Sequence, residues 1–176
     1  MNAAAHQHAI TVLGHDRPGI IAEATGRLAE LGLNLEDSTM TLLRGHFAMM
    51  LVCAGSATAP EIESALAPLT ADGSLSVSVR EVPEEQVAPA AGTSWVLTVH
   101  GGDRPGIVSS VVSEVAAAGG NITDLTTRLA GDLYLLVAEI DLPASADAAA
   151  VESAIHEAAS RVGVAATMRP AEADDL

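Results

Sequence analysis

The chain has 176 residues, of which 49% are hydrophobic and only 2% aromatic, and its formal net charge is −15 at pH 7. That apolar content is enough to fill a globular core and excludes a chain that is disordered by composition. The negative charge argues against direct contact with nucleic acid, because phosphate binding needs clustered Lys and Arg and base stacking needs aromatic side chains.

The first half of the chain has the residue patterns of a small α+β unit. Pro18 suits the first position of a helix, and Gly32 suits the left-handed residue that ends one. Between them, apolar residues recur close to the helical period. In chain order the predicted elements are a strand at 9–13, a helix at 18–31, strands at 35–43 and 47–53 with a hairpin at 44–46, a helix at 60–69 and a strand at 75–79.

The second half repeats the first at a constant offset. The pentapeptide that begins at Asp16 recurs at Asp103, 87 residues later (103 − 16), and Asn34 is matched by Asn121 in the same register. A repeat of this length is a duplicated small domain rather than a solenoid unit. Its predicted elements are a strand at 95–99, a helix at 105–118, strands at 122–129 and 133–140, a helix at 146–162 and a strand at 164–168.

Both halves have the element order β-α-β-β-α-β, which is the split ferredoxin-like motif. We therefore predict an α+β chain of two ferredoxin-like βαββαβ domains in tandem, at residues 1–81 and 94–170. Residues 82–93 contain Pro, Glu and Gly and are expected to form an exposed linker. Residues 171–176 are expected to be a short acidic tail.

Two predicted strands lack the alternation expected of a sheet with helices on one face. The segments 47–53 and 133–138 are apolar at nearly every position. We interpret them as strands that are buried on both faces, so each sheet needs a cover that one unit cannot supply. The other unit or a second chain would provide it, and we expect a homodimer.

The candidate site is the turn between the first strand and the first helix. A helix N-terminus offers unpaired N–H groups to an anion, and Gly19 would let a ligand approach the backbone. Asp16 adds an acceptor for a cation. A free amino acid carries both charges. A phosphate would be repelled by Asp16, and the turn is not followed by the lysine of a P-loop.

Structural roles are the alternative for the same residues. Asp16 and Asp103 would satisfy backbone donors in the turn. Asn34 and Asn121 would be turn residues that tolerate positive φ. Because Asn34 lies at the opposite end of the helix from the first turn, the two could meet in one pocket only across an interface between two units.

These residues resemble ACT domains, small βαββαβ modules that bind amino acids and regulate metabolic enzymes. The resemblance rests on the motif Gly-x-Asp-Arg-Pro-Gly-Ile, which begins at Gly14 and again at Gly101, and on the asparagine after each helix. It covers nearly the whole chain outside the linker and the ends. The ligand positions that it implies are His15, Asp16, Pro18, Gly19, Ile20, Asn34, Gly102, Asp103, Pro105, Gly106, Ile107 and Asn121.

Two ACT domains without an attached enzyme resemble the glycine cleavage system transcriptional repressor group. That resemblance implies a non-catalytic regulator that senses an amino acid, glycine or serine, and contacts a protein partner such as a transcription factor. The alternative is a separately encoded regulatory subunit of an amino-acid metabolic enzyme. His15 is matched by Gly102 in the second unit, so the resemblance does not imply equal ligand affinity in the two units.

The sequence gives little support to catalytic, metal-binding or membrane functions. No nucleophile, acid–base pair or cofactor motif emerges, so we expect no enzyme and no cofactor. His6 and His8 have no clear Cys or carboxylate set with them, so no metal site is expected. Cys53 in its apolar run indicates a buried, inert thiol. Without a signal peptide pattern or a run of 18 apolar residues, a cytoplasmic protein with no membrane partner is expected.

Overall fold

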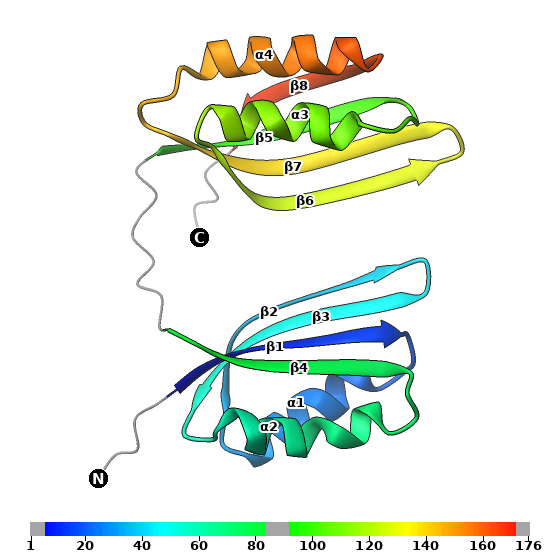
Figure 1. The fold of residues 1–176 in the computed structure, drawn as a ribbon, viewed down its shortest axis with the longest axis vertical. Coiled ribbons are helices and arrows are strands. Elements are labelled where there is room, and N and C mark those ends of the chain that lie inside the picture. Colours follow the sequence, from blue (N-terminus) through cyan, green and yellow to red (C-terminus); the bar gives the residue numbers. More distant parts are fainter. Residues whose placement is uncertain (1–5, 84–91, 172–176) are drawn as a thin grey trace. The chain divides into compact units, whose positions relative to one another are not determined.

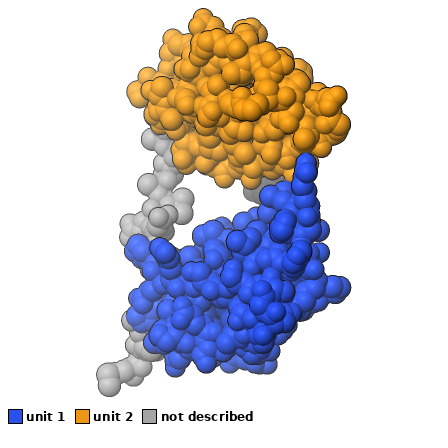
Figure 2. Space-filling model, turned by 45° about the vertical axis from the view of Figure 1, so that its right-hand side comes forward, with its two compact units in different colours: residues 1–87 blue, residues 88–176 orange. Residues whose placement is uncertain are grey.

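The computed structural model of the chain describes residues 6–83 and 92–171 (Figure 1). The chain divides into two compact units, residues 1–87 and 88–176, which Figure 2 colours separately. Most of the predicted linker and tail lies outside the described residues.

Unit 1 contains the predicted β-α-β-β-α-β order with one additional 3₁₀ turn. Its elements are β1 (His6–His15), α1 (Ile20–Glu30), β2 (Asn34–Leu43), β3 (His46–Gly55), α2 (Ala59–Leu66), η1 (Ala67–Thr70) and β4 (Leu75–Val82). The predicted helix at 60–69 thus changes to a 3₁₀ turn at Ala67. Pro68 lies in that turn and cannot donate a backbone hydrogen bond to a continuing α-helix.

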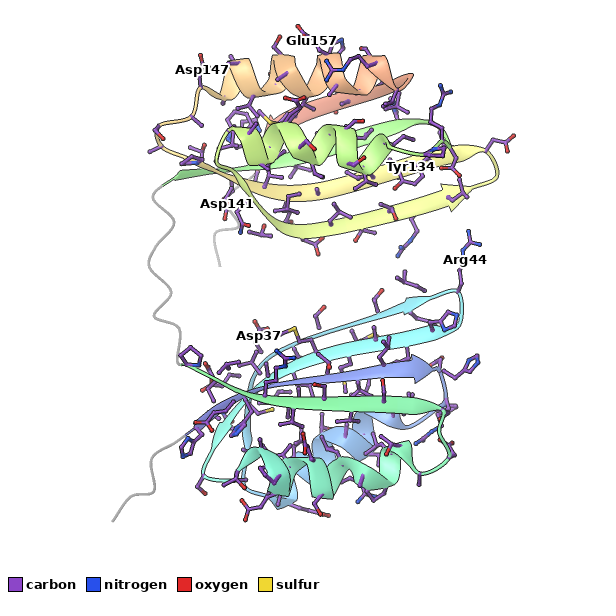
Figure 3. All side chains as sticks on the ribbon, in the orientation of Figure 1. Asp37, Arg44, Tyr134, Asp141, Asp147 and Glu157 are labelled. Carbon is purple, nitrogen blue, oxygen red and sulfur yellow. The ribbon has the colours of Figure 1, made fainter. Side chains whose placement is uncertain are left out.

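Unit 2 repeats this order. Its elements are β5 (Gly92–Gly102), α3 (Ile107–Ala117), β6 (Asn121–Ala130), β7 (Leu133–Pro143), α4 (Ala148–Arg161) and β8 (Val164–Pro170). The predicted helix at 146–162 begins later, because Asp147 is its N-cap and accepts hydrogen bonds from the N–H groups of Ala149 (3.1 Å) and Ala150 (3.3 Å). Figure 3 labels Asp147 at this end of α4.

Each unit is a four-stranded antiparallel sheet with two helices on one face (Figure 1). The strand orders are β2-β3-β1-β4 and β6-β7-β5-β8. The first strand of each unit is therefore an inner strand, with the β2–β3 or β6–β7 hairpin on one side and the last strand on the other. This is the ferredoxin-like arrangement, and the predicted fold class of two such domains in tandem is confirmed.

The cores are built from aliphatic side chains, as the scarcity of aromatic residues requires. In unit 1, Ile10 and Val12 of β1 pack with Ile20, Ala24 and Leu28 of α1. Unit 2 has the matching set Leu97, Val99, Ile107, Val111 and Val115. The cores thus lie between each sheet and its helices, which puts the first turn at the border of the core.

The opposite face of each sheet is apolar but exposed. On β3, Phe47 and Leu51 are buried against the helices, whereas Met50, which points the other way, is 45% exposed. On β7, Leu136 is buried and Leu135 is 37% exposed. Both described helices of each unit lie on the other face of its sheet, so no described helix of its own unit covers this face (Figure 1). The expected cover of this face, by the other unit or by a second chain, therefore stays a prediction.

A polar side chain sits in the core of unit 1 without partners. His8 of β1 is 0% exposed, and neither of its ring nitrogens has a hydrogen-bond partner among the described residues. Its register neighbours are Cys53 on β3 and Glu81 on β4. A buried imidazole without hydrogen bonds costs free energy relative to an apolar side chain of similar size.

Replacing His8 with leucine is therefore expected to raise the free energy of unfolding by about 1 kcal/mol. Urea unfolding followed by circular dichroism measures the change. His100→Leu is the matched control, since His100 is exposed on β5 and its replacement should leave stability nearly unchanged. A less stable His8→Leu protein would contradict the interpretation that the imidazole lacks partners.

Candidate functional site

The first turn of unit 1 is held in place by backbone hydrogen bonds from two sides. The His15 N–H donates to the Ser74 carbonyl (2.9 Å), and the Asp16 N–H donates to the Gly45 carbonyl (3.1 Å). Gly14 and His15, which the sequence analysis placed in the turn, are the last residues of β1, because the strand keeps its pairing with β3 to its end. Unit 2 repeats the second contact, from the Asp103 N–H to the Asp132 carbonyl (3.1 Å).

The glycines before the helices are required by their backbone conformation. Gly19 has φ 89° and Gly106 has φ 93°, the left-handed region that favours glycine. A Cβ atom added at either position would meet nothing within 4 Å. The space beside both residues is therefore open, which leaves the backbone accessible to a ligand.

The N-termini of α1 and α3 carry free donors, in contrast to the other two helices. Neither Gly19 nor Gly106 supplies a side-chain cap. By contrast, Thr58 and Glu61 form a capping box at α2, and Asp147 caps α4. The first N–H groups of α1 and α3 thus have no intrahelical partner and point out of the helix end.

The carboxylates at both turns are exposed and unengaged. The carboxylate oxygens of Asp16 and Asp103 accept no hydrogen bond from a backbone or side-chain donor, and they form no ion pair, with any described residue. The alternative that they satisfy backbone donors of the turn therefore has no support in the described geometry. Each is an available acceptor beside a set of free donors.

Four of the remaining predicted residues have positions that limit what they can contact. Pro18 and Pro105 do not begin the helices, as the sequence analysis expected, because the left-handed glycine lies between each of them and the first helical residue. The side chains of Ile20 and Ile107 are 1% and 2% exposed and belong to the cores. Only the backbone N–H of each isoleucine can reach a ligand.

Asn34 and Asn121 are the exposed first residues of β2 and β6. Neither has positive φ, since Arg44 is the one non-glycine residue with positive φ in the described part of the chain, so that alternative is wrong. Within a unit, the 11 residues of α1 separate Asn34 from the first turn. The structure thus does not bring Asn34 and Asp16 together in one unit.

The two turns differ in their electrostatics. In unit 1, Glu23 forms ion pairs with Arg27 (3.0 Å) and with Arg17 (3.3 Å). The hydrogen bond from Arg27, and to a smaller extent that from Arg17, holds the pKa of the Glu23 carboxyl below its usual value. In unit 2, Arg104 has no ion-pair partner among the described residues. Its guanidinium lies instead over Gly163, where an added Cβ would be 2.6 Å from Nη1.

A groove beside α1 was not foreseen from the sequence. It has a volume of about 570 Å³ and an apolar lining, which includes Ala22 and Gly26 of α1 with Leu33, Leu35 and Cys53. Burial raises the pKa of the Cys53 thiol, consistent with the expected inert cysteine. The groove offers no charged partners for an amino acid, and none of the predicted site residues lines it.

Among the described residues, no three His, Cys, Asp or Glu side chains gather closely enough to hold a metal ion. None of the helices in the described part of the chain has the length and apolar character of a membrane-crossing segment, and α4, with 14 residues, is the longest of them.

Comparison with known proteins gives a family for both units. The ACT domain model matches residues 6–80 and 93–169. The glycine cleavage system transcriptional repressors of Escherichia coli (strain K12) and Shigella flexneri are each 31% identical to this chain over 157 residues, which covers 85% of this chain and 82% of theirs. A crystal structure of an unknown protein from Galdieria sulphuraria matches 96% of this chain and 100% of that one, with 27% identity and a TM-score of 0.81.

The chain therefore belongs to the ACT domain family and consists of two ACT domains in tandem. Over most of its length it is similar to the glycine cleavage system transcriptional repressors. The resemblance inferred from the two Gly-x-Asp-Arg-Pro-Gly-Ile motifs is confirmed.

Proposed function

We propose that this chain is a non-catalytic regulatory protein that binds a free amino acid at the first turns and acts through a protein partner. The observation that carries the proposal is the repeated geometry of the two turns. Each combines uncapped helix N–H groups, a glycine with open space beside it and an unengaged carboxylate. These groups are complementary to an α-carboxylate and an α-ammonium group.

The size and charge of the turn favour a small ligand. A large side chain would have to lie in solvent, because Asp16 and its neighbours in the turn are exposed rather than enclosed. Glycine or serine therefore fits the turn best, because its side chain is absent or small and leaves little apolar surface in contact with solvent. The exposed Asn34 and Asn121 would contribute from a neighbouring unit, since each lies at the far end of its own helix.

The regulatory role is supported by the relatives, which are named as transcriptional repressors of the glycine cleavage system. A net charge of −15 opposes direct DNA binding, so an effect on transcription would pass through another protein. A separately encoded regulatory subunit of an amino-acid metabolic enzyme is the second candidate. Affinity purification of the tagged chain from native cells separates the two, because the first retrieves a transcription factor and the second an enzyme.

Amino-acid binding is tested by calorimetry after a thermal-shift screen of the twenty amino acids, since a ligand of the native state raises its melting temperature. Asp16→Ala and Asp103→Ala are each expected to weaken binding at their own turn roughly tenfold or more, because each removes a charged hydrogen-bond acceptor for the ammonium group.

The matched controls are Glu63→Gln and Glu152→Gln, which remove one exposed negative charge each from α2 and α4. These variants should bind as the unchanged protein does. Affinity that persists in the Asp16→Ala/Asp103→Ala double variant would refute the proposed role of both carboxylates.

A further inference from the structure

Two histidines lie side by side at the first turn of unit 1. His15 is the last residue of β1 and His46 is the first residue of β3, and the two are directly opposite in the strand register. Their rings are stacked, with centroids 5.6 Å apart and planes 21° from parallel. Both side chains are exposed, and neither ring forms a hydrogen bond with a described residue.

The backbone holds this pair in place. The His15 N–H is bonded to the Ser74 carbonyl (2.9 Å), and the Asp16 N–H that follows is bonded to the Gly45 carbonyl (3.1 Å), next to His46. The tight β2–β3 turn supports the same end, with Arg44 at φ 51° and Gly45 at φ 84°; Figure 3 labels Arg44 at its tip. Only side-chain rotation is then needed to aim both rings at one point.

We propose that His15 and His46 form a binding site for a divalent transition-metal ion of the Zn²⁺, Ni²⁺ or Cu²⁺ class. Imidazole nitrogens are preferred ligands of these ions, and a Zn–N bond is about 2.0–2.1 Å long. Two nitrogens that share one ion are thus separated by roughly 3–4 Å, a distance that two rings in direct cross-strand register can reach. Mg²⁺ and Ca²⁺, which prefer oxygen ligands, are not expected to bind.

The site supplies two protein ligands and leaves the other coordination positions to water. No third His, Cys, Asp or Glu side chain is placed to complete it among the described residues. Such an ion would be exchangeable rather than structural, because structural zinc sites use four protein ligands. The expectation of no metal site rested on His6 and His8 alone, because the pairing of His15 with His46 depends on strand register and is not visible in the sequence.

Unit 2 provides an internal comparison, because the matching positions cannot bind a metal. Gly102 and Leu133 stand opposite each other there, in the register of His15 and His46. The other histidine pair is also a poor site. His8 is fully buried, and the His6 Nδ1 atom lies 2.7 Å from a Glu81 carboxylate oxygen. The proposal is therefore specific to one end of unit 1.

The first test is calorimetric titration of the full chain with ZnCl₂ and with NiCl₂ at neutral pH, after treatment with EDTA. We expect one ion to bind at this pair, and His15→Ala or His46→Ala to weaken its binding roughly a hundredfold, since each loses the chelate advantage. In EDTA, both variants should have the same melting temperature as the unchanged protein, because the His15 and His46 side chains are exposed. His100→Ala, which removes an exposed histidine whose register partners are Leu135 and Ala165, is the matched control.

The second test builds the pair into unit 2 with Gly102→His and Leu133→His. A Cβ at Gly102 would make an ordinary contact of 3.5 Å with Arg104, and Leu133 is 53% exposed, so the double variant should fold. We expect it to bind a second ion. The proposal is overturned by an unchanged protein that binds neither metal, by His15→Ala and His46→Ala variants that bind as tightly as before, or by a folded double variant without the second ion.

Discussion

Replacing Gly14 with alanine is expected to destabilise unit 1 by about 3 kcal/mol or more, the range of substitutions that force a steric clash in a fixed backbone. A Cβ atom at this position would lie 2.0 Å from the Ser74 carbonyl oxygen and 2.9 Å from the Leu75 Cα atom. The carbonyl cannot simply move, because it accepts the hydrogen bond from the His15 N–H (2.9 Å). At φ 155°, the backbone of Gly14 also disfavours a side chain.

Urea unfolding measures this effect unit by unit. The single tryptophan, Trp95, lies on β5, so its fluorescence reports on unit 2, whereas circular dichroism reports on both units. The Gly14→Ala variant should lose its unit 1 transition at lower urea concentration and keep the fluorescence transition. Gly26→Ala in α1 is the control with the same chemical change, since its Cβ would meet nothing within 4 Å.

The control should have the opposite sign. Alanine within a helix is more favourable than glycine by about 0.5–1 kcal/mol, so Gly26→Ala should stabilise unit 1 slightly. If Gly14→Ala unfolds at the urea concentration of the unchanged protein, the close approach of β1 to the start of β4 is not the reason for the glycine at this position.

The topology of the chain could be predicted from its duplication. The same order of patterns occurs twice, so an ambiguous strand in one half is supported by its partner in the other. The end of the first helix at Gly32 was also predictable, because a left-handed backbone selects glycine and Gly32 has φ 71°. Element ends were less accessible, since the pairing of Gly14 and His15 with β3 depends on residues some thirty positions away.

The candidate site was predictable as residues but not as geometry. The motif identified the turn, yet the left-handed conformation of Gly19 and the absence of a cap on α1 depend on the backbone. The bulges in β2 and β6, between Leu35 and Asp37 and between Ile122 and Asp124, have no simple sequence signal. They shift the strand register by one residue, so the alternation of side chains along β2 does not reveal which residues face the helices.

The second large effect concerns the apolar sheet faces that no helix of their own unit covers. We propose that another apolar surface covers them, the other unit or a second copy of the chain. Met50 of unit 1 and Leu135 of unit 2 lie on these faces. Met50→Glu and Leu135→Glu should then each lower the free energy of unfolding by about 3 kcal/mol or more, because an unpaired charge is placed in an apolar interface.

The same substitutions discriminate sharply between covered and open faces. On a face that is open to water, a change to glutamate should alter stability by no more than about 0.5 kcal/mol, as for surface positions generally. Ser64→Glu on the exposed side of α2 calibrates that surface value.

Sedimentation equilibrium at several concentrations then identifies the cover. A second copy makes the association of the unchanged protein depend on concentration and makes both variants monomeric, whereas a cover within the chain leaves a monomer throughout. Met50→Glu and Leu135→Glu proteins as stable as the Ser64→Glu protein would rule out the cover altogether.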